Sequence, residues 1–289
     1  MSDNLTECAP PRALQAWLTR GQRQLQAAGR ASARLEAELL LAHVLGRSRS
    51  YLLTHAGEPL APEPAARYGA LLARAAGGEP LAYLTGEREF WSLTLTVSPD
   101  VLIPRPETEL AVERCLSLLT DAGPAPRVCD LGTGAGSIAL ALAAERPNWR
   151  VTATDLSAAA LEVARANARR LGLSHIEFVV GDWLAPLAAR DFELIVSNPP
   201  YIGMRDPALE ALRHEPRAAL TPGATGLEAL QRLIHDAHAQ LSMGGWLVLE
   251  HGADQRAAVA EALVEAGYAR VRCHRDLAGH DRVSEGQRL

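Results

Sequence analysis

The tetrapeptide Asn198-Pro199-Pro200-Tyr201 is the part of the chain best suited to chemistry on a planar nitrogen. The Asn198 side-chain oxygen and the Pro199 carbonyl can each accept one N–H of an amide or amino group, which aims the nitrogen lone pair at an electrophile. Because both prolines lock φ, the Pro199 carbonyl stays in place, and Tyr201 offers a flat face for stacking. Taken alone, the same four residues could also form an ordinary turn after a strand.

A glycine-rich turn follows the apolar segment Arg127–Leu131 and opens a helical pattern. It consists of Gly132-Thr133-Gly134-Ala135-Gly136-Ser137, and glycines there let a ligand approach the backbone at a helix N-terminus. The dinucleotide-binding fingerprint G-x-G-x-x-G needs glycine where this chain has Ser137. Counted from Asp130, the spacing is D-x-G-x-G-x-G, which resembles the first motif of class I methyltransferases. The resemblance implies that Asp130 and residues 132–136 bind S-adenosylmethionine.

Three further residues fit the same cofactor at the ends of the next two predicted strands. Asp155 is placed to accept from both ribose hydroxyls, while Asp182 and Trp183 are suited to bonding the adenine amino group and covering the ring. Alone, Asp155 could cap a helix and Trp183 is more often a core residue. Their co-occurrence favours a cofactor site, because open α/β sheets bind ligands at the carboxyl ends of their strands. Asn198 ends the fourth strand at that edge and is included among the cofactor-binding residues.

The predicted reaction is methyl transfer from S-adenosylmethionine, with S-adenosylhomocysteine as product. It needs no general base, because a methylated nitrogen carries positive charge and sheds its proton readily, and none of the nine histidines falls in these motifs. The four cysteines are widely scattered, so neither a disulfide framework nor a metal site is predicted. They are expected to be reduced and mostly buried: Cys8, Cys115, Cys129 and Cys273.

The segments that position these residues alternate between strand and helix patterns after Pro106. Strands are predicted over 127–131, 150–154, 176–180, 192–197 and 246–250. Helices are predicted over 107–119, 136–145, 158–171, 226–241 and 254–266. This alternation indicates an α/β fold with a Rossmann-like, mostly parallel sheet covered on both faces. The C-terminal stretch places two strands around Leu277-Ala278-Gly279 with no helix between them, so the last strand should be antiparallel.

The N-terminal part has the pattern of a small helical domain. Four apolar residues recur there at helical spacing: Leu35, Leu39, Leu40 and Val44. Gly46 follows as a stop, Pro64 precedes a second amphipathic run, and Gly77-Gly78 closes it. Such a domain could merely stabilise the protein, but a partner-binding role is favoured because the chemistry elsewhere does not need it.

Between the two domains, a segment rich in aromatic and branched residues predicts a bridging β-hairpin with Ser98-Pro99-Asp100 as its turn. The sequence thus predicts three parts. Residues 1–78 form a helical substrate-binding domain, 79–106 a linker with the hairpin, and 107–289 a class I S-adenosylmethionine-dependent methyltransferase domain.

Composition is that of an ordinary globular protein, with 289 residues, 48% apolar and 22% charged. No apolar run approaches the roughly 20 residues that cross a bilayer, and the N-terminus has no signal-peptide core, so a cytoplasmic protein without membrane contact is expected. All 29 basic residues are arginine, and the net charge of −5 argues mildly against nucleic acid as the main ligand. A monomer is expected.

Over nearly its whole length the chain resembles the bacterial release factor glutamine methyltransferases, the PrmC/HemK family. Besides the helical domain and the glycine-rich turn, the resemblance is carried by Pro80–Trp91, Leu102–Glu109, Asn198–Tyr201, Glu215–Leu220 and Asp276–Gly279. It implies that the substrate is the glutamine of the Gly-Gly-Gln motif in class I release factors, docked partly through the helical domain, so that the enzyme modulates translation termination.

The resemblance also implies that Phe90 and the segment Ile103-Pro104-Arg105-Pro106 help Asn198–Tyr201 to form the substrate pocket. The chain departs from the family at Thr225-Gly226-Leu227, where Asp-Gly-Leu is common, and in its last strand, Val283–Gly286.

Four rival functions remain at this stage. Amino-directed DNA adenine methyltransferases use the same tetrapeptide on a flipped base, and a sister enzyme modifies a glutamine of a large-subunit ribosomal protein. A nicotinamide oxidoreductase is disfavoured by Ser137. A non-catalytic binding module would have little use for Asn198.

Overall fold

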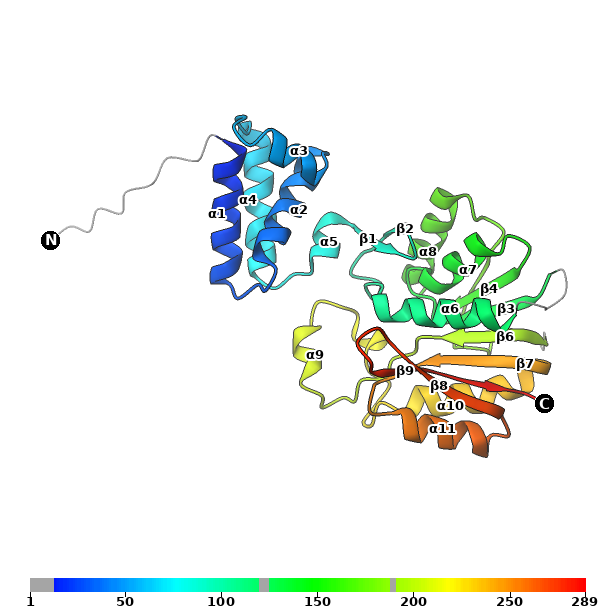
Figure 1. Ribbon diagram of the computed structural model, residues 1–289. Coiled ribbons are helices and arrows are strands. Elements are labelled where there is room, and N and C mark those ends of the chain that lie inside the picture. Colours follow the sequence, from blue (N-terminus) through cyan, green and yellow to red (C-terminus); the bar gives the residue numbers. More distant parts are fainter. Residues whose placement is uncertain (1–12, 120–124, 188–190) are drawn as a thin grey trace. The chain divides into compact units, whose positions relative to one another are not determined.

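The computed structural model describes residues 13–119, 125–187 and 191–289. The chain divides into two compact units at the junction of Gly86 and Glu87 (Figure 1). Cys8 lies outside the described residues. Across the described ranges, no helix is both long enough and apolar enough to cross a bilayer.

The first unit is helical, as predicted. Its helices are α1 (Leu14–Ala27), α2 (Ala33–Leu45), α3 (Arg49–Thr54), α4 (Pro62–Ala76) and α5 (Leu81–Thr85). Helix α2 ends where Gly46 adopts a left-handed conformation with φ 60°, which only glycine takes without steric cost. Helix α4 begins with Pro62, whose fixed φ suits a first helical position. Helices α1, α2 and α4 pack against one another around one hydrophobic core.

The buried stripe of α2 differs from the predicted one by part of a turn. Leu40 and Val44 are buried as expected, but Leu35 is 41% exposed and Leu41 is fully buried instead. The observed stripe of Ala37, Leu40, Leu41 and Val44 has the i, i+3, i+4, i+7 spacing of one helix face. The prediction was wrong at Leu35 because helix α2 is apolar on more than one side, so spacing alone did not select the face.

A close helix approach explains a glycine within α1. A Cβ atom added at Gly21 would lie 2.2 Å from the Tyr68 hydroxyl of α4. Tyr68 is fully buried, and its hydroxyl donates to the Ala37 carbonyl of α2 at 3.1 Å. One aromatic side chain therefore links the three long helices of the unit, in a space that exists only because residue 21 has no side chain.

The second unit is built on a seven-stranded sheet in the order β5-β4-β3-β6-β7-β9-β8. The strands are β3 (Arg127–Leu131), β4 (Arg150–Asp155), β5 (Glu177–Val180), β6 (Phe192–Ser197), β7 (Leu241–Glu250), β8 (Ala269–Arg275) and β9 (Asp281–Gln287). Strands β5, β4, β3, β6 and β7 are parallel to one another, whereas β9 runs antiparallel to both of its neighbours. The predicted sheet is confirmed, although β7 begins at Leu241 rather than at residue 246.

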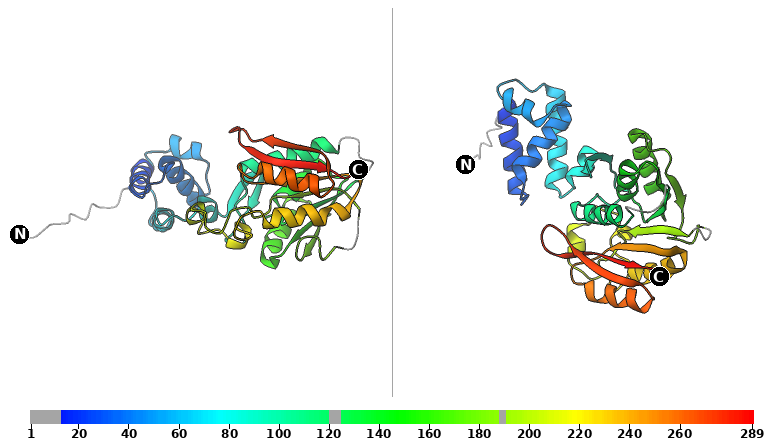
Figure 2. Two further views of the ribbon diagram at one scale, coloured as in Figure 1. Left: turned by 90° about the horizontal axis from the view of Figure 1, so that it is seen from below. Right: turned by 45° about the vertical axis from the view of Figure 1, so that its right-hand side comes forward.

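Helices cover both faces of this sheet (Figure 1 and, from two further directions, Figure 2). The predicted helices are confirmed with ends shifted by at most two residues: α6 (Glu109–Leu118), α7 (Ser137–Glu145), α8 (Ala158–Leu171), α10 (Glu228–Gln240) and α11 (Arg256–Glu265). Shorter elements are η1 (Pro106–Thr108), α9 (Ala208–Ala211) and η2 (Arg217–Ala219).

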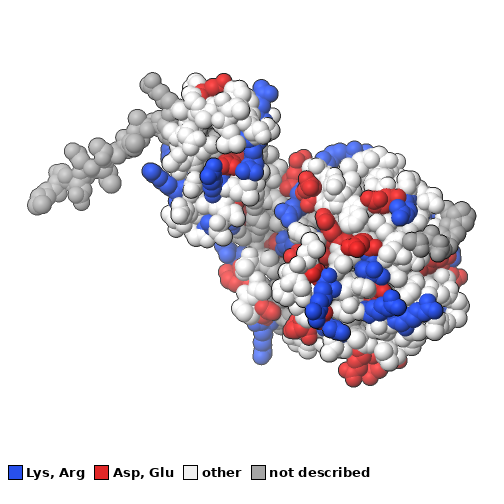
Figure 3. Space-filling view, viewed as in Figure 1, with Lys and Arg blue, Asp and Glu red and all other residues white. Residues whose placement is uncertain are grey.

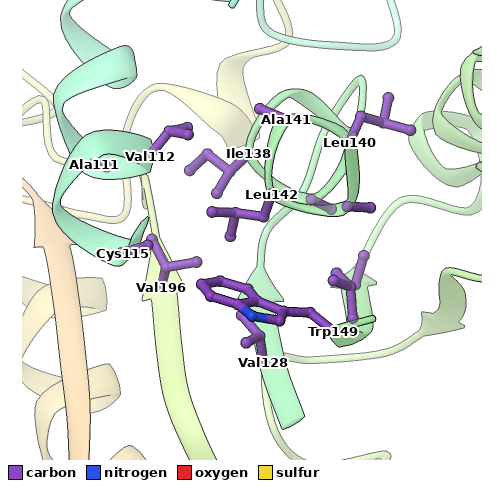
Figure 4. Packing of buried hydrophobic residues seen from close by; sticks show 14 of the residues in the cluster. Ala111, Val112, Cys115, Val128, Ile138, Leu140, Ala141, Leu142, Trp149 and Val196 are labelled. Atoms are coloured by element: carbon purple, nitrogen blue, oxygen red, sulfur yellow. The ribbon is translucent and has the colours of Figure 1, made fainter. Parts of the chain in front are cut away.

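Alternate residues of the central strands serve two separate cores. Val128 points to the core under α6, α7 and α8, while its neighbour Cys129 belongs to the core under α10 and α11. Figure 4 shows Val128, Ile138, Leu142 and Trp149 converging in the first of these cores. Strand periodicity of two thus buries β3 on both faces and leaves its carboxyl end free to carry the glycine-rich turn.

The predicted hairpin exists, but its turn lies elsewhere. Strands β1 (Glu87–Phe90) and β2 (Leu93–Thr96) pair antiparallel around Trp91 and Ser92, whose φ angles are 51° and 59°. Two consecutive positive φ angles are those of a type I′ hairpin turn. Ser98-Pro99-Asp100 also forms a turn, in which the Val101 N–H donates to the Ser98 carbonyl at 3.1 Å, but residues 101–103 directly after it form no strand.

Side chains of the second unit hold this unusual turn in place. The Trp91 backbone N–H donates to Glu109 and its indole N–H to Glu145, both at 2.8 Å. The Asn167 side chain exchanges two hydrogen bonds with the backbone of Thr96. The prediction missed the turn because these partners are remote in sequence and because Trp-Ser is not a typical type I′ pair.

Candidate active site

The glycine-rich turn is shaped by left-handed backbone at Gly132 and Gly136, with φ of 72° and 89°. A Cβ atom at Gly132 would lie 2.9 Å from the Trp183 ring, and one at Gly136 would lie 2.8 Å from Leu140. The Gly132 and Thr133 N–H groups both donate to the Thr154 carbonyl of β4 at 2.9 Å. The two hydrogen bonds to Thr154 therefore hold the turn in place, and the Trp183 ring lies next to it at Gly132.

Asp130 links this turn to helix α7 by hydrogen bonds. Its Oδ2 accepts from the Thr133 hydroxyl at 2.6 Å and from the Ala139 N–H at 3.1 Å. Its Oδ1 is buried and has no hydrogen-bond partner in the described part of the chain. Burial raises the pKa of Asp130 to about 7 despite these two donors. An unpaired buried acceptor beside a cavity fits a cofactor that carries an amino group.

Asp155 ends β4 and binds backbone on both of its oxygens. Oδ2 accepts from the Gly134 N–H at 2.9 Å and Oδ1 from the Ser157 N–H at 2.8 Å, while burial raises the pKa of the carboxyl. Each carboxylate oxygen can accept a second hydrogen bond. The side chain therefore stabilises two turns and keeps acceptor capacity for a ligand's hydroxyl groups.

Asp182 and Trp183 follow β5 and line the same cavity as Asp155. Asp182 forms an ion pair with Arg232 of α10 at 2.8 Å, with both side chains nearly half exposed. Trp183 is half-buried and has a positive φ of 52°. Sequence reasoning missed Arg232, because nothing in α10 distinguishes it from other surface arginines.

Three cavities meet at Asn198. The largest, of about 320 Å³, is lined by Gly132, Gly134, Asp155, Asp182, Trp183 and Pro200, among others. A small one, of about 40 Å³, is lined by Asp130 and residues 132–135 together with Arg105 and Thr108. The third, of about 200 Å³, is lined by Arg105, Pro199, Tyr201 and apolar residues of the following loop. Asn198 lines all three cavities. A ligand that occupies both the 320 Å³ and the 40 Å³ cavities therefore passes Asn198 next to the 200 Å³ cavity.

The Asn198 side chain is held by one hydrogen bond, from Nδ2 to the Thr108 hydroxyl at 3.0 Å. With Nδ2 so engaged, Oδ1 is the atom available to accept from a ligand. The Tyr201 hydroxyl donates to Glu250 at 3.2 Å, and its backbone carbonyl accepts from Gln255 at 3.0 Å. Burial raises the pKa of Tyr201, so the phenol stays neutral.

The loop containing Thr225 packs against the tetrapeptide at Tyr201. A Cβ atom at Gly226, whose φ is 83°, would lie 2.3 Å from the Tyr201 carbonyl. The Thr225 and Gly226 N–H groups donate to Glu228 at 2.9 Å, and the Thr225 hydroxyl accepts from the Leu227 N–H at 3.2 Å. Threonine thus serves as a side-chain acceptor where the family commonly has aspartate.

The two residues assigned to the substrate pocket by resemblance lie in different environments. Arg105 lines two of the three cavities and forms an ion pair with the buried Glu215, which also accepts from the Ile103 N–H at 3.0 Å. Phe90 is 1% exposed, packs in the core beside Leu95 and lines none of these cavities. Phe90 therefore supports the hairpin and does not face the site.

Two residues that sequence reasoning did not single out complete the site. Thr108 holds Asn198, and Glu250 holds Tyr201. Glu250 ends an apolar strand with a carboxylate, which is the same signal that revealed Asp155. Within the described residues, no group of three or more His, Cys, Asp or Glu side chains is arranged to hold a metal ion.

Comparison with known proteins identifies the relatives of this chain. Residues 16–86 match the family model described as the PrmC N-terminal domain, and residues 111–266 match the methyltransferase small domain. The chain is 51% identical to the release factor glutamine methyltransferase of Burkholderia pseudomallei, over 88% of this chain and 91% of the relative. It is 44% identical to the one of Escherichia coli, over 94% and 98%.

A solved structure shows the same fold at low identity. A T. thermophilus 16S rRNA methyltransferase in complex with AdoMet and guanosine matches with a TM-score of 0.54 and 18% identity, over 70% of this chain and 50% of that one. Methyltransferases of this fold use S-adenosylmethionine, and both the class I fold and the helical first unit were predicted. The identities and coverage of the curated relatives establish that the chain belongs to the release factor glutamine methyltransferase family.

Proposed function

We propose that this chain transfers the methyl group of S-adenosylmethionine to the side-chain amide nitrogen of the glutamine in the Gly-Gly-Gln motif of class I release factors, and so modulates translation termination. The observation that carries the proposal is the position of Asn198 where three cavities meet, with Pro199 and Tyr201 lining the third. Membership of the family supports the choice of substrate.

The cofactor supplies an electrophilic methyl group on its sulfonium. In the proposed arrangement, Asp155 accepts from the ribose hydroxyls, and Asp182 and Trp183 receive the adenine. The glycine-rich turn and the unpaired Oδ1 of Asp130 receive the amino acid end. These assignments follow the lining of the two cofactor cavities, and the product that leaves them is S-adenosylhomocysteine.

Asn198 and Pro199 provide the chemistry of the acceptor cavity. An amide nitrogen is a poor nucleophile, because its lone pair is delocalised into the carbonyl. Acceptance of its two N–H bonds by the Asn198 Oδ1 and the Pro199 carbonyl fixes the nitrogen and favours the charge that develops during transfer. Apart from Asn198, Tyr201 and the Arg105 side chain, which is paired with Glu215, the cavity is lined by apolar residues such as Leu102 and Leu220. These apolar residues limit the access of water that would compete for the two acceptors.

The helical first unit is the proposed docking element for the release factor. Its hydrophobic core is built from its own residues, and the catalytic unit has two cores of its own. That the enzyme acts as a cytoplasmic monomer stays a prediction.

The rival acceptors are less well supported. A duplex DNA acceptor calls for a basic face, and on the face shown in Figure 3 acidic and arginine side chains are interspersed. The curated relatives described above are named for release factors and not for a ribosomal protein.

Intact-mass analysis tests the proposal directly. Unmethylated release factor is incubated with the protein and S-adenosylmethionine, beside a release factor whose Gly-Gly-Gln glutamine is replaced by alanine. A gain of one methylene on the first and none on the second is expected. Equal gains would move the acceptor elsewhere on the release factor, and no gain would reject the substrate and direct the same assay to the ribosomal protein.

A further inference from the structure

A chain of polar contacts runs from Asn198 to a buried carboxylate that touches none of the three cavities. The Asn198 Nδ2 donates to Thr108 Oγ1 at 3.0 Å. A hydroxyl that accepts one hydrogen bond still has its own proton to donate. Thr108 is 4% exposed, so this proton needs a protein acceptor, and the Thr108 side chain lies near enough to the Glu250 carboxyl to lower its pKa.

The same carboxylate also holds Tyr201. Glu250 Oε1 accepts from the Tyr201 hydroxyl at 3.2 Å, while the buried Oε2 has no hydrogen-bond partner in the described part of the chain and remains to accept the Thr108 proton. Strands β6 and β7 are neighbours, with Ser197 paired to Leu249, so Glu250 lies beside Asn198 at the carboxyl ends of these two strands. Glu250 therefore connects Thr108, which lines the small cavity, with Tyr201, which lines the acceptor cavity.

Packing alone gives no reason for a carboxylate in this position. Glu250 is 1% exposed, and burial raises its pKa to about 7. Thr108, Arg282 and Tyr201 lower this pKa, and Glu107 raises it further. A buried carboxyl group with a strongly perturbed pKa next to a site is a candidate functional residue.

We infer that Glu250 is a positioning residue for methyl transfer, which acts through Thr108 to fix the orientation of the Asn198 amide and through Tyr201 to fix the acceptor cavity. The inference rests on the proposed function.

The direction of the hydrogen bonds explains why a carboxylate is needed. A carboxylate can only accept, so the Thr108 proton points to Glu250 and the Thr108 oxygen accepts from the Asn198 Nδ2. Asn198 Oδ1 then remains for the substrate. If Glu250 becomes neutral, its O–H can donate to Thr108, whose proton can turn to Asn198. The Asn198 amide can then form an equally good hydrogen bond to Thr108 after a flip that exchanges Oδ1 and Nδ2. In the flipped orientation Nδ2 faces the substrate amide, and the acceptor for the substrate N–H is lost.

The first test observes Asn198 without requiring transfer. In the ¹⁵N-labelled protein, the side-chain amide signal of Asn198 is assigned by its loss in Asn198→Asp. We expect this signal to shift between pH 6 and 8 in the wild type, to be changed in Thr108→Val and Glu250→Gln at all pH values, and to be restored in Thr108→Ser. An unchanged signal in Thr108→Val and Glu250→Gln would overturn the inference.

Glu285→Gln is the matched control, because Glu285 is another fully buried carboxylate, on β9 next to β7, and is paired with Arg114 and His274. It should leave the Asn198 signal in place. If it changes the signal as much as Glu250→Gln does, the effect is general loss of a buried charge and the inference fails.

Transfer to release factor is then measured by intact mass in single turnovers. We expect Thr108→Val and Glu250→Gln to reduce the rate by about 10- to 100-fold, with S-adenosylmethionine affinity within about 3-fold. This is less than the loss expected for a group that itself meets the developing charge, because Asn198 remains in both variants. Thr108→Ser should recover most of the rate. A wild type with the expected amide signals but no transfer would reject the proposed substrate and leave the positioning role standing. Full rates in both variants would reject the role.

Discussion

Asn198 contributes a single acceptor to the proposed reaction, whereas the proposed cofactor cavity is lined by residues from three other strand ends. Removing one preorganised group at a developing charge costs about 10²- to 10³-fold in rate. Asn198→Ala should therefore lower transfer by about that factor or more and leave S-adenosylmethionine affinity within about 3-fold, measured by intact mass and by titration calorimetry. Asn148→Ala, at an exposed asparagine before β4, is the control. A retained rate in Asn198→Ala would reject orientation as the mechanism.

Asp130 makes folding stability depend on pH in a defined direction. Its pKa is raised from 3.8 to about 7 by burial, so the native state binds this proton more tightly than the unfolded state. The resulting stabilisation is complete below pH 3.8 and is lost as the pH rises through 7. The shift of about three pKa units corresponds to about 4 kcal/mol.

Asp130→Asn should therefore flatten the pH dependence of the unfolding free energy. Urea unfolding of wild type and variant at pH 5 and pH 8 measures this, and Glu113→Gln, at an exposed position of α6, is the control. Because Glu250 contributes in the same direction, some slope should remain in Asp130→Asn. An identical slope in wild type and Asp130→Asn would contradict the burial effect.

At the scale of elements, the glycine-rich turn and the end of helix α8 provide a matched pair of glycines. Gly132 and Gly172 both have a φ of 72°, but a Cβ atom meets the Trp183 ring at the first and nothing within 4 Å at the second. We expect Gly132→Ala and Gly172→Ala each to lose about 1 kcal/mol of unfolding free energy, because alanine is strained at positive φ.

Only Gly132→Ala should also weaken S-adenosylmethionine binding, by about 10-fold or more, since the Trp183 ring must move out of the cavity that it lines. Calorimetric titration of both variants measures this difference. Equal affinities in the two variants would show that the Trp183 ring does not form part of the adenine site.

The hairpin turn stores strain that its anchoring contacts offset. Ser92 adopts a φ of 59° and, as the second turn residue, sits where type I′ turns prefer glycine. Ser92→Gly should therefore raise the unfolding free energy by about 1 kcal/mol. Ser98→Gly should lower it, because Ser98 bonds the side chain and the N–H of Asp100. Thermal and urea unfolding of the two variants and the wild type measures both changes. If Ser92→Gly is less stable than Ser98→Gly, the prediction is wrong.

At the scale of the whole molecule, each compact unit has its own hydrophobic core, so the catalytic unit is expected to fold without the first. Deleting residues 1–86 should weaken transfer to folded release factor more than transfer to a short Gly-Gly-Gln peptide, because only the folded protein can use a docking surface outside the acceptor cavity. The ratio of kcat/KM values for the two substrates measures this effect. Equal losses on both substrates would reduce the helical unit to a stabiliser.

Local sequence patterns were sufficient to predict the features of this protein that are encoded within short segments. Strand, glycine-rich turn and helix are contiguous at residues 127–145, and Asn198–Tyr201 directly follows a strand, so periodicity and turn chemistry were enough to place both. The same local signals predicted the helical first unit and the antiparallel end of the sheet.

The contacts between side chains that are distant in sequence became visible in the folded protein. Thr108 lies 90 residues before Asn198, Glu250 lies 49 after Tyr201, and Ile103 lies 112 before Glu215. These pairs depend on strand order and register, which place β6 beside β7 and which no local pattern contains. The hairpin turn was missed for the same physical reason, because its positive φ angles are stabilised by Glu109 and Glu145 and not by the turn residues themselves.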